Sequence, residues 1–265
     1  MSEILNNELG SEKLERSIKT LAILYGLADE DLKYFAGLSL LERHSFTPSR
    51  HYDFKILNYG VQEKIILINN KTHGEGKSIF EFLQGQQSAM FDIPLNFNNL
   101  REYMESQIAE IIKHAEHKSH EIFVDFITEL SANECIGFLE SSQEKYNLHF
   151  KIGEKTEIIF KNALKVYSVS EIISLLWSAF KSALAKTQTG NISRSQAALS
   201  VIPNFERLLL RASEDKWKIT KYSRLNSIPQ SILSNIVFNY VLGSYDDGYH
   251  FSIPWLYVSL KLGDV

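Results

Sequence analysis

The sequence predicts a predominantly helical α+β protein, and three observations support this class. The chain has 13 Gly and 5 Pro in 265 residues, which leaves little turn-forming material for an all-β fold. Apolar residues recur at helical spacing over much of the chain, for example at Leu100, Met104, Ile108 and Ile111. Short runs rich in β-branched and aromatic residues lie next to glycines and indicate a few strands.

The N-terminal part is predicted to contain helices followed by a β-hairpin. Residues 11–27 place apolar side chains at helical spacing, and residues 29–44 begin with acidic side chains, which favour the first turn of a helix. Residues 51–57 and 61–69 are apolar runs separated by Asn-Tyr-Gly, a sequence typical of a tight turn. We therefore expect these two runs to pair as antiparallel strands.

A long central helix is predicted to begin near Asn98, and its apolar pattern resumes at Ile122. Two further strand-like runs follow, residues 147–153 and 156–168. Glycine at position 153 favours a turn between them, so we expect a second strand pair.

The C-terminal part is predicted to be helical. Ser168 or Ser170 can cap a helix over residues 171–186, because a serine hydroxyl accepts a hydrogen bond from a free backbone N–H of the first turn. Residues 191–215 offer one or two further helices, broken or kinked at Pro203.

The C-terminal region, residues 166–265, is predicted to be winged-helix-like. Ser227 and Pro229 favour the start of a helix over residues 230–240. Asp247-Gly248 then lies between two strand-like pieces, which is a hairpin signal. Two helices followed by a β-hairpin give the element order of a winged helix.

Charge is distributed unevenly along the chain, although the total is only −4. Residues 186–225 hold eight Lys and Arg against three Asp and Glu, hence +5, so the rest of the chain carries −9. We therefore predict an α+β N-terminal region, residues 1–165, and a helical basic C-terminal region, residues 166–265. The basic region is expected to contact DNA, RNA or an acidic protein.

The residues expected to make these contacts fall into two groups. Cations would contact phosphates or the carboxylates of a protein partner, and uncharged polar side chains on the helix over residues 230–240 would read base edges. The first group is Arg194, Arg207, Arg211, Lys216, Lys218, Lys221 and Arg224, and the second is Gln230, Ser231, Ser234 and Asn235.

The stretch Lys71-Thr72-His73-Gly74-Glu75-Gly76-Lys77-Ser78 resembles a phosphate-binding loop at its end only. Gly76, Lys77 and Ser78 match the pattern G-x-x-x-x-G-K-[ST], but Lys71 stands where the first glycine belongs. Asp125 is the best candidate for the second Mg²⁺ ligand, yet its surroundings have helical spacing. A degenerate nucleotide-binding protein or NTPase is therefore an alternative, not the leading interpretation.

Other reactive side chains are interpreted structurally. His114, His117 and Glu121 share one face of the predicted helix, where we expect them to be exposed rather than to bind metal. Cys135 has helical core spacing and is expected to be a buried structural thiol. No metal, cofactor or catalytic residue is predicted.

The leading interpretation is a cytoplasmic, non-catalytic binding or accessory protein. The N-terminus is polar and acidic, unlike a signal peptide, and apolar runs are too short for a membrane span. A single cysteine fits a reducing compartment. Besides the nucleotide-binding alternative, a purely structural subunit of a larger complex remains open.

Overall fold

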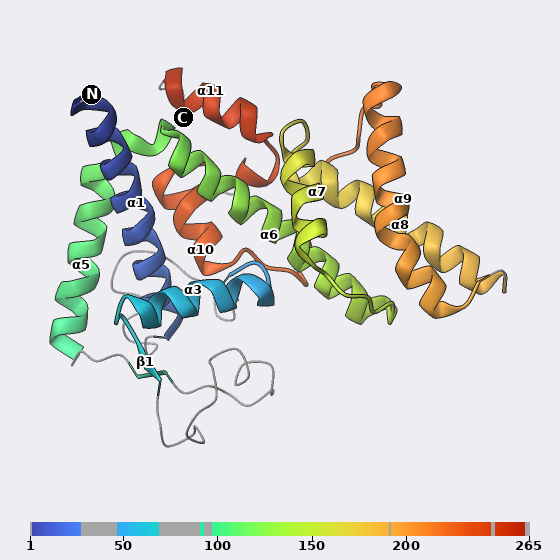
Figure 1. Cartoon of the computed structure of the whole chain (residues 1–265), viewed down its shortest axis with the longest axis horizontal. Helices are drawn as coiled ribbons and strands as arrows, with labels where there is room; N and C mark the ends of the chain where they lie inside the picture. The colour runs from blue at the N-terminus through green and yellow to red at the C-terminus, as the bar shows by residue number, and fades with distance from the viewer. Residues whose placement is uncertain are drawn as a thin grey trace. The chain divides into compact units, whose positions relative to one another are not determined.

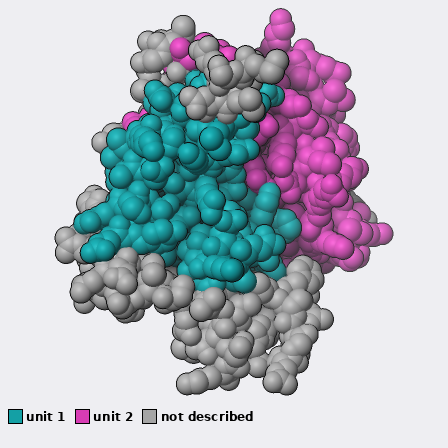
Figure 2. Space-filling view, turned by 60° about the vertical axis from the view of Figure 1, so that its left-hand side comes forward, with its two compact units in different colours: residues 1–123, 230–241 teal, residues 124–229, 242–265 magenta. Residues whose placement is uncertain are grey.

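The structure is a computed structural model that describes residues 2–27, 47–68, 91–92, 97–190, 192–244 and 247–262 (Figure 1). The described chain is helical, and it forms two compact units (Figure 2). The N-terminal unit contains residues 1–123 and 230–241, and the C-terminal unit contains residues 124–229 and 242–265. The predicted domain boundary at 165/166 stays a prediction, because a compact unit and an independently folding domain are different properties.

The N-terminal unit is organised around helix α1. Leu14, Ile18 and Leu21 follow a spacing of four and three residues and are fully buried, as expected for the apolar stripe of a helix. α1 contacts most other helical elements of this unit. The elements are α1 (Ser2–Leu27), α3 (Arg50–Gln62), α5 (Phe97–His114), the 3₁₀ helix η1 (Ala115–Ser119), the short helix α10 (Ile232–Ser234) and the π-helical η2 (Asn235–Val241).

The predicted β-hairpin over residues 51–57 and 61–69 is wrong. Residues 50–62 form α3, whose first turn is capped by the Ser49 hydroxyl accepting from the backbone N–H of Tyr52 at 3.2 Å. Tyr52, Ile56 and Gly60 recur every four residues and are buried, so a helical period prevails over the strand-like composition. Extended pairing in the described chain is limited to two residues a side, β1 (Leu67–Ile68) antiparallel to β2 (Phe91–Asp92).

The predicted long central helix is confirmed, with an interruption. α5 ends at His114, η1 follows, and α6 (Glu121–Tyr146) starts in the N-terminal unit and continues into the C-terminal unit. The helix predicted over residues 29–44 and the candidate phosphate loop lie outside the described residues.

The C-terminal unit is built from α6 and four further helical elements with a short 3₁₀ turn. α8 and α9 pack against each other (Figure 1). An edge-to-face contact between Phe160 and Phe205, with centroids 5.6 Å apart, joins α7 to α9. The elements are α7 (Glu154–Leu164), α8 (Val169–Gln188), α9 (Arg194–Glu214), the 3₁₀ turn η3 (Asp247–Tyr249) and α11 (Ile253–Leu262).

The second predicted strand pair, residues 147–153 and 156–168, is also wrong. Most of the later run forms α7, and residues 148–153 have no regular secondary structure. Thr156, Phe160 and Ala163 are buried at spacings of four and three, so this run also follows the helical period.

The helix predicted after Ser168 is confirmed together with its cap. The Ser168 hydroxyl accepts from the Glu171 N–H at 3.3 Å, and the Glu171 carboxylate accepts from the Ser168 N–H at 2.8 Å, which is a capping box. α9 is continuous, so of the two predicted alternatives the break at Pro203 is excluded and the single helix is confirmed. Pro203 is exposed, where water can bond the Leu199 carbonyl that lost its helical donor.

The winged-helix-like arrangement is not what the chain forms. The cap of the short helix is Ser231 rather than Ser227, and the helix passes into a π-helical segment. Residues 247–262, expected as a hairpin, form a 3₁₀ turn and α11. Pro254 lies in the first turn of α11, where a missing N–H costs no helical hydrogen bond. Of the helices described, none combines the length and apolar character that crossing a bilayer requires.

Candidate functional site

Most of the predicted contact cations lie on α9 and on residues 216–224, called here the basic segment. Arg194, Arg207 and Arg211 are exposed on α9, and Lys216 and Lys218 are exposed after its end. Within the described part of the chain, none of these five cations forms an ion pair. Arg207 instead donates to the Asn204 side-chain carbonyl, which leaves its positive charge uncompensated.

The exposed face of α9 also carries two apolar side chains, with the partly exposed Glu206 beside them on the helical wheel. At 100° per residue, Leu199 and Leu210 lie opposite Val201 and Phe205, which are fully buried. The side chains of Leu199 and Leu210 are 67% and 58% exposed. Arg207 lies about 60° from this line, so a guanidinium borders an apolar ridge.

Arg224 has a different environment from the other predicted contacts. Its guanidinium donates to the Glu134 carboxylate at 2.6 Å and lies over the Tyr249 ring, 4.5 Å from the centroid. The side chains of Arg224 and Glu134 are only 10% and 4% exposed. Arg224 therefore links the basic segment to α6 and η3. Lys221 is also engaged, because its ammonium donates to the His250 carbonyl at 2.6 Å.

The side chains predicted to read bases are mostly engaged within the N-terminal unit. Ser231 and Ser234 are fully buried and their hydroxyls are 3.0 Å apart. Gln230 and Asn239 bond each other through their side-chain amides, at 3.2 and 3.5 Å. Asn235 is partly exposed. The polar side of residues 230–240 thus faces the protein to a large extent, because the helix begins later than predicted and continues as a π-helix.

The histidine cluster is rearranged by the break at η1. His114 is buried at 8% exposure and its Nε2 lies 3.1 Å from the Glu110 carboxylate, so the prediction that it is exposed is wrong. His117 stacks on His114 with centroids 5.8 Å apart, whereas Glu121 belongs to the next helix. In the described residues, no group of three or more His, Cys, Asp or Glu side chains could hold a metal ion.

Cys135 is fully buried, which confirms the structural interpretation of this thiol. Burial raises the pKa of the Cys135 thiol well above its ordinary range, and the adjacent Glu134 carboxylate raises it further. A thiol that stays protonated is a poor nucleophile.

A cavity of about 260 Å³ in the C-terminal unit was not predicted. Its lining includes Trp177 from α8 and Tyr222 from the basic segment. The two rings meet edge to face with centroids 5.6 Å apart, although the residues are far apart in the chain. Only the fold brings them together, so no local pattern could have indicated the cavity.

Comparisons of the chain with protein-family models, with curated proteins and with solved structures returned no match.

Proposed function

We propose that this is a non-catalytic binding or accessory protein, cytoplasmic in location, whose C-terminal unit contacts an acidic protein partner through α9 and the basic segment. The observation that carries the proposal is the exposed apolar ridge of Leu199 and Leu210 beside Arg207 and Arg211, which form no ion pair with described residues. An apolar centre bordered by arginine is the composition of protein interfaces.

A protein partner fits this surface better than a nucleic acid does. Phosphate backbones are recognised by charge and hydrogen bonds, which gives no use for two exposed leucines. The side chains expected to read bases are buried or hydrogen-bonded to each other, as Ser231 and Ser234 illustrate.

The partner segment that matches this surface is an acidic amphipathic helix. Its apolar side chains would cover Leu199 and Leu210, and its carboxylates would accept from the guanidinium groups of Arg207 and Arg211. Arginine bonds carboxylates through two parallel N–H groups, which fixes orientation as well as charge. The apolar and the charged contacts use the same face of α9, so a partner helix must present apolar side chains and carboxylates together.

The test uses the tagged full-length chain in cells and two double variants. Leu199→Ser/Leu210→Ser removes the ridge, and Arg207→Gln/Arg211→Gln removes the charge. Both alter exposed side chains, so each variant should keep the fold. Val166→Ser is the matched control, because Val166 is 65% exposed in the same unit but lies outside α9.

We expect an acidic protein to co-purify with the native chain despite nuclease treatment. The control variant should retain it, and either double variant should reduce the recovered amount at least tenfold. With the purified partner, the arginine variant should slow association and reduce salt sensitivity. Binding of duplex DNA or single-stranded RNA to the chain is the opposing outcome. If either binds, and the arginine variant flattens the logarithmic salt slope by about 1.8 units on duplex DNA or about 1.4 on single-stranded RNA while the leucine variant changes nothing, the partner is a nucleic acid.

A further inference from the structure

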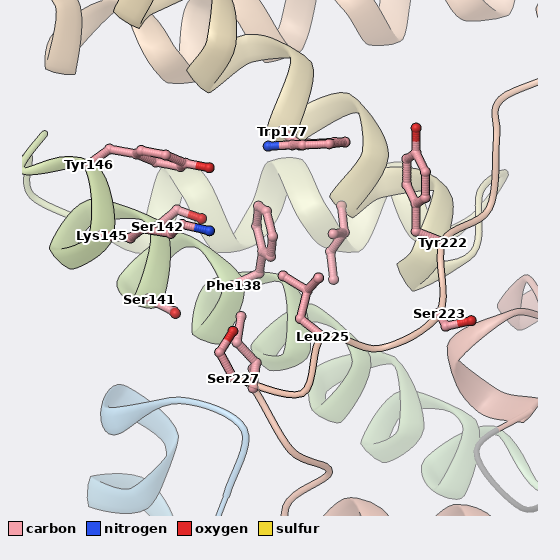
Figure 3. A pocket seen from close by; sticks show the side chains of 12 residues that line it. Phe138, Ser141, Ser142, Lys145, Tyr146, Trp177, Tyr222, Ser223, Leu225 and Ser227 are labelled. Carbon is pink, nitrogen blue, oxygen red and sulfur yellow. The ribbon is translucent and has the colours of Figure 1, made fainter.

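The cavity in the C-terminal unit lies between two helices and the end of the basic segment (Figure 3). α6 contributes Phe138 and Tyr146, α8 contributes Trp177, and the chain after α9 contributes Tyr222 and Leu225. A volume of about 260 Å³ exceeds the roughly 150 Å³ that holds benzene in an engineered cavity. It therefore has room for a substituted ring or a bicycle.

Four aromatic side chains line this cavity, together with aliphatic side chains and serines. Phe138 is buried at 4% exposure, whereas Tyr222 is 43% exposed, so the cavity has a closed side and an open side. The edge-to-face contact between the Trp177 and Tyr222 rings forms one corner of the cavity. Flat aromatic surfaces favour a flat apolar ligand, because ring contacts add to the gain from burying apolar area.

The polar groups at the cavity are two that can only donate, on Lys145 and Trp177, together with hydroxyls of tyrosine and serine, which donate or accept. Figure 3 shows the indole nitrogen of Trp177 directed toward the hydroxyl of Tyr146, with the ammonium of Lys145 below them. Lys145 forms no ion pair with described residues, and its ammonium lies 5.5 Å from the Tyr146 ring centroid. The indole N–H and the ammonium can only donate, and the tyrosine hydroxyl can also donate.

The charge balance of the cavity selects the ligand class. Among the described residues that line it, none carries a carboxylate and Lys145 is the one cation, while the Lys181 ammonium lies 3.6 Å from the Trp177 ring centroid without belonging to the lining. A cationic ligand would find no counter-charge, and a neutral apolar ligand would leave the donors unbonded. A single positive charge with two neutral donors matches one carboxylate, whereas a doubly charged phosphate would keep an uncompensated charge.

From this geometry we infer that the cavity binds a small aromatic carboxylate, with the ring between Phe138, Trp177 and Tyr222 and the carboxylate against Lys145, Tyr146 and the indole N–H of Trp177. The cavity shares Tyr222 of the basic segment with the proposed partner surface, but it uses neither Leu199 nor Arg207, so variants of α9 test the partner surface separately.

The test is a titration of the purified full-length chain with 2-naphthoate, compared with 2-naphthamide, which has the same ring and no charge. Calorimetry gives the dissociation constants, and the indole N–H signal of Trp177, assigned by its loss in Trp177→Phe, reports the place of binding. We expect saturable 2-naphthoate binding that shifts this signal, with 2-naphthamide at least tenfold weaker, since hydrogen bonds to a charged group are the stronger ones.

Lys145→Gln should abolish the preference for 2-naphthoate, and the control Lys155→Gln should leave it intact, because Lys155 is an exposed lysine on α7 outside the cavity lining. Equal binding of the two compounds by the native chain overturns the inference. Naphthoate binding that Lys145→Gln does not weaken, or that leaves the Trp177 signal unmoved, also overturns it, as does the absence of binding at millimolar concentration.

Discussion

The ion pair between Arg224 and Glu134 is the residue-scale feature with the largest expected effect on stability. Both side chains are nearly inaccessible, and the bond is 2.6 Å long. Removing one partner of a buried pair leaves the other charged without compensation, which costs about 3–5 kcal/mol. We expect Arg224→Leu to lower the free energy of unfolding by this amount, measured by equilibrium urea denaturation.

The double variant Glu134→Leu/Arg224→Leu is the matched control for this pair. Replacing both charges by apolar side chains removes the unpaired carboxylate, so the double variant should be more stable than Arg224→Leu alone. A loss below about 1 kcal/mol for the single variant would indicate an exposed pair, and Arg224 would return to the list of partner contacts.

The thiol of Cys135 should be inert in the folded chain. It is the one cysteine in the sequence, it is fully buried, and burial raises its pKa. We expect no reaction with a disulfide reagent at neutral pH and one equivalent after unfolding in urea. Fast labelling of the native chain would contradict the burial.

The same raised pKa makes stability depend on pH. Above about pH 8.5 the thiol of the unfolded chain ionises while the buried thiol of Cys135 stays protonated. The folded state therefore binds more protons there, and its stability falls as pH rises. Cys135→Ala should show a smaller fall over the same alkaline range in urea denaturation.

At the scale of elements, the local sequence predicted a helix correctly where the apolar helical pattern extends over a long segment. The prediction was wrong where the segment is short. α5 and α8 are eighteen and twenty residues long, and their apolar pattern and the Ser168 cap were visible in the sequence. α3 and α7 span only 13 and 11 residues. Their β-branched and aromatic residues favour strands by composition, while their buried positions follow the helix, so tertiary packing decided the outcome.

The contact between α1 and η1 depends on a glycine. A Cβ at Gly10 would lie 2.1 Å from Cδ2 of His117, which is too close unless the ring moves. Overpacking of this kind costs about 1–3 kcal/mol. We expect Gly10→Ala to lower the free energy of unfolding by this amount, and Gly10→Ala/His117→Ala to recover most of it.

Gly153→Ala is the control for this contact, because a Cβ there would meet no atom within 4 Å. Thermal and urea unfolding of the three variants separate the steric effect from the general effect of alanine on chain entropy. Equal stabilities of Gly10→Ala and the native chain would mean that α1 and η1 are not closely packed.

At the scale of the whole molecule, the charge distribution of the sequence identified the basic region, but it did not predict what each cation contacts. The +5 of residues 186–225 is a property of the sequence, whereas the burial of Arg224 depends on Glu134, ninety positions away. The cavity likewise needs α6, α8 and the basic segment together. Exposed leucines on α9 could have been suspected from the helical wheel, because Leu199 and Leu210 lie opposite its buried positions.

The two compact units also make a prediction about the whole chain, because each is built from discontinuous segments. The N-terminal unit needs residues 230–241, which contribute Leu233, Ile236 and Val237 to its core and contact α1. A fragment of residues 1–165 lacks them. The sequence-based division into 1–165 and 166–265 predicts two domains that fold alone, whereas the compact units predict that a cut at 165 divides both cores.

We therefore expect the fragment 1–165 to show no cooperative urea transition and poor dispersion of its amide NMR signals, with the intact chain measured under identical conditions. Burying Leu233, Ile236 and Val237 is worth roughly 1.5–3 kcal/mol a side chain, which is comparable to the net stability of a small domain. Adding the fragment 166–265 should restore the transition, because it returns residues 230–241 to α1. A cooperative transition in 1–165 alone would instead establish the boundary at 165/166, since its core would then be complete without the C-terminal segment.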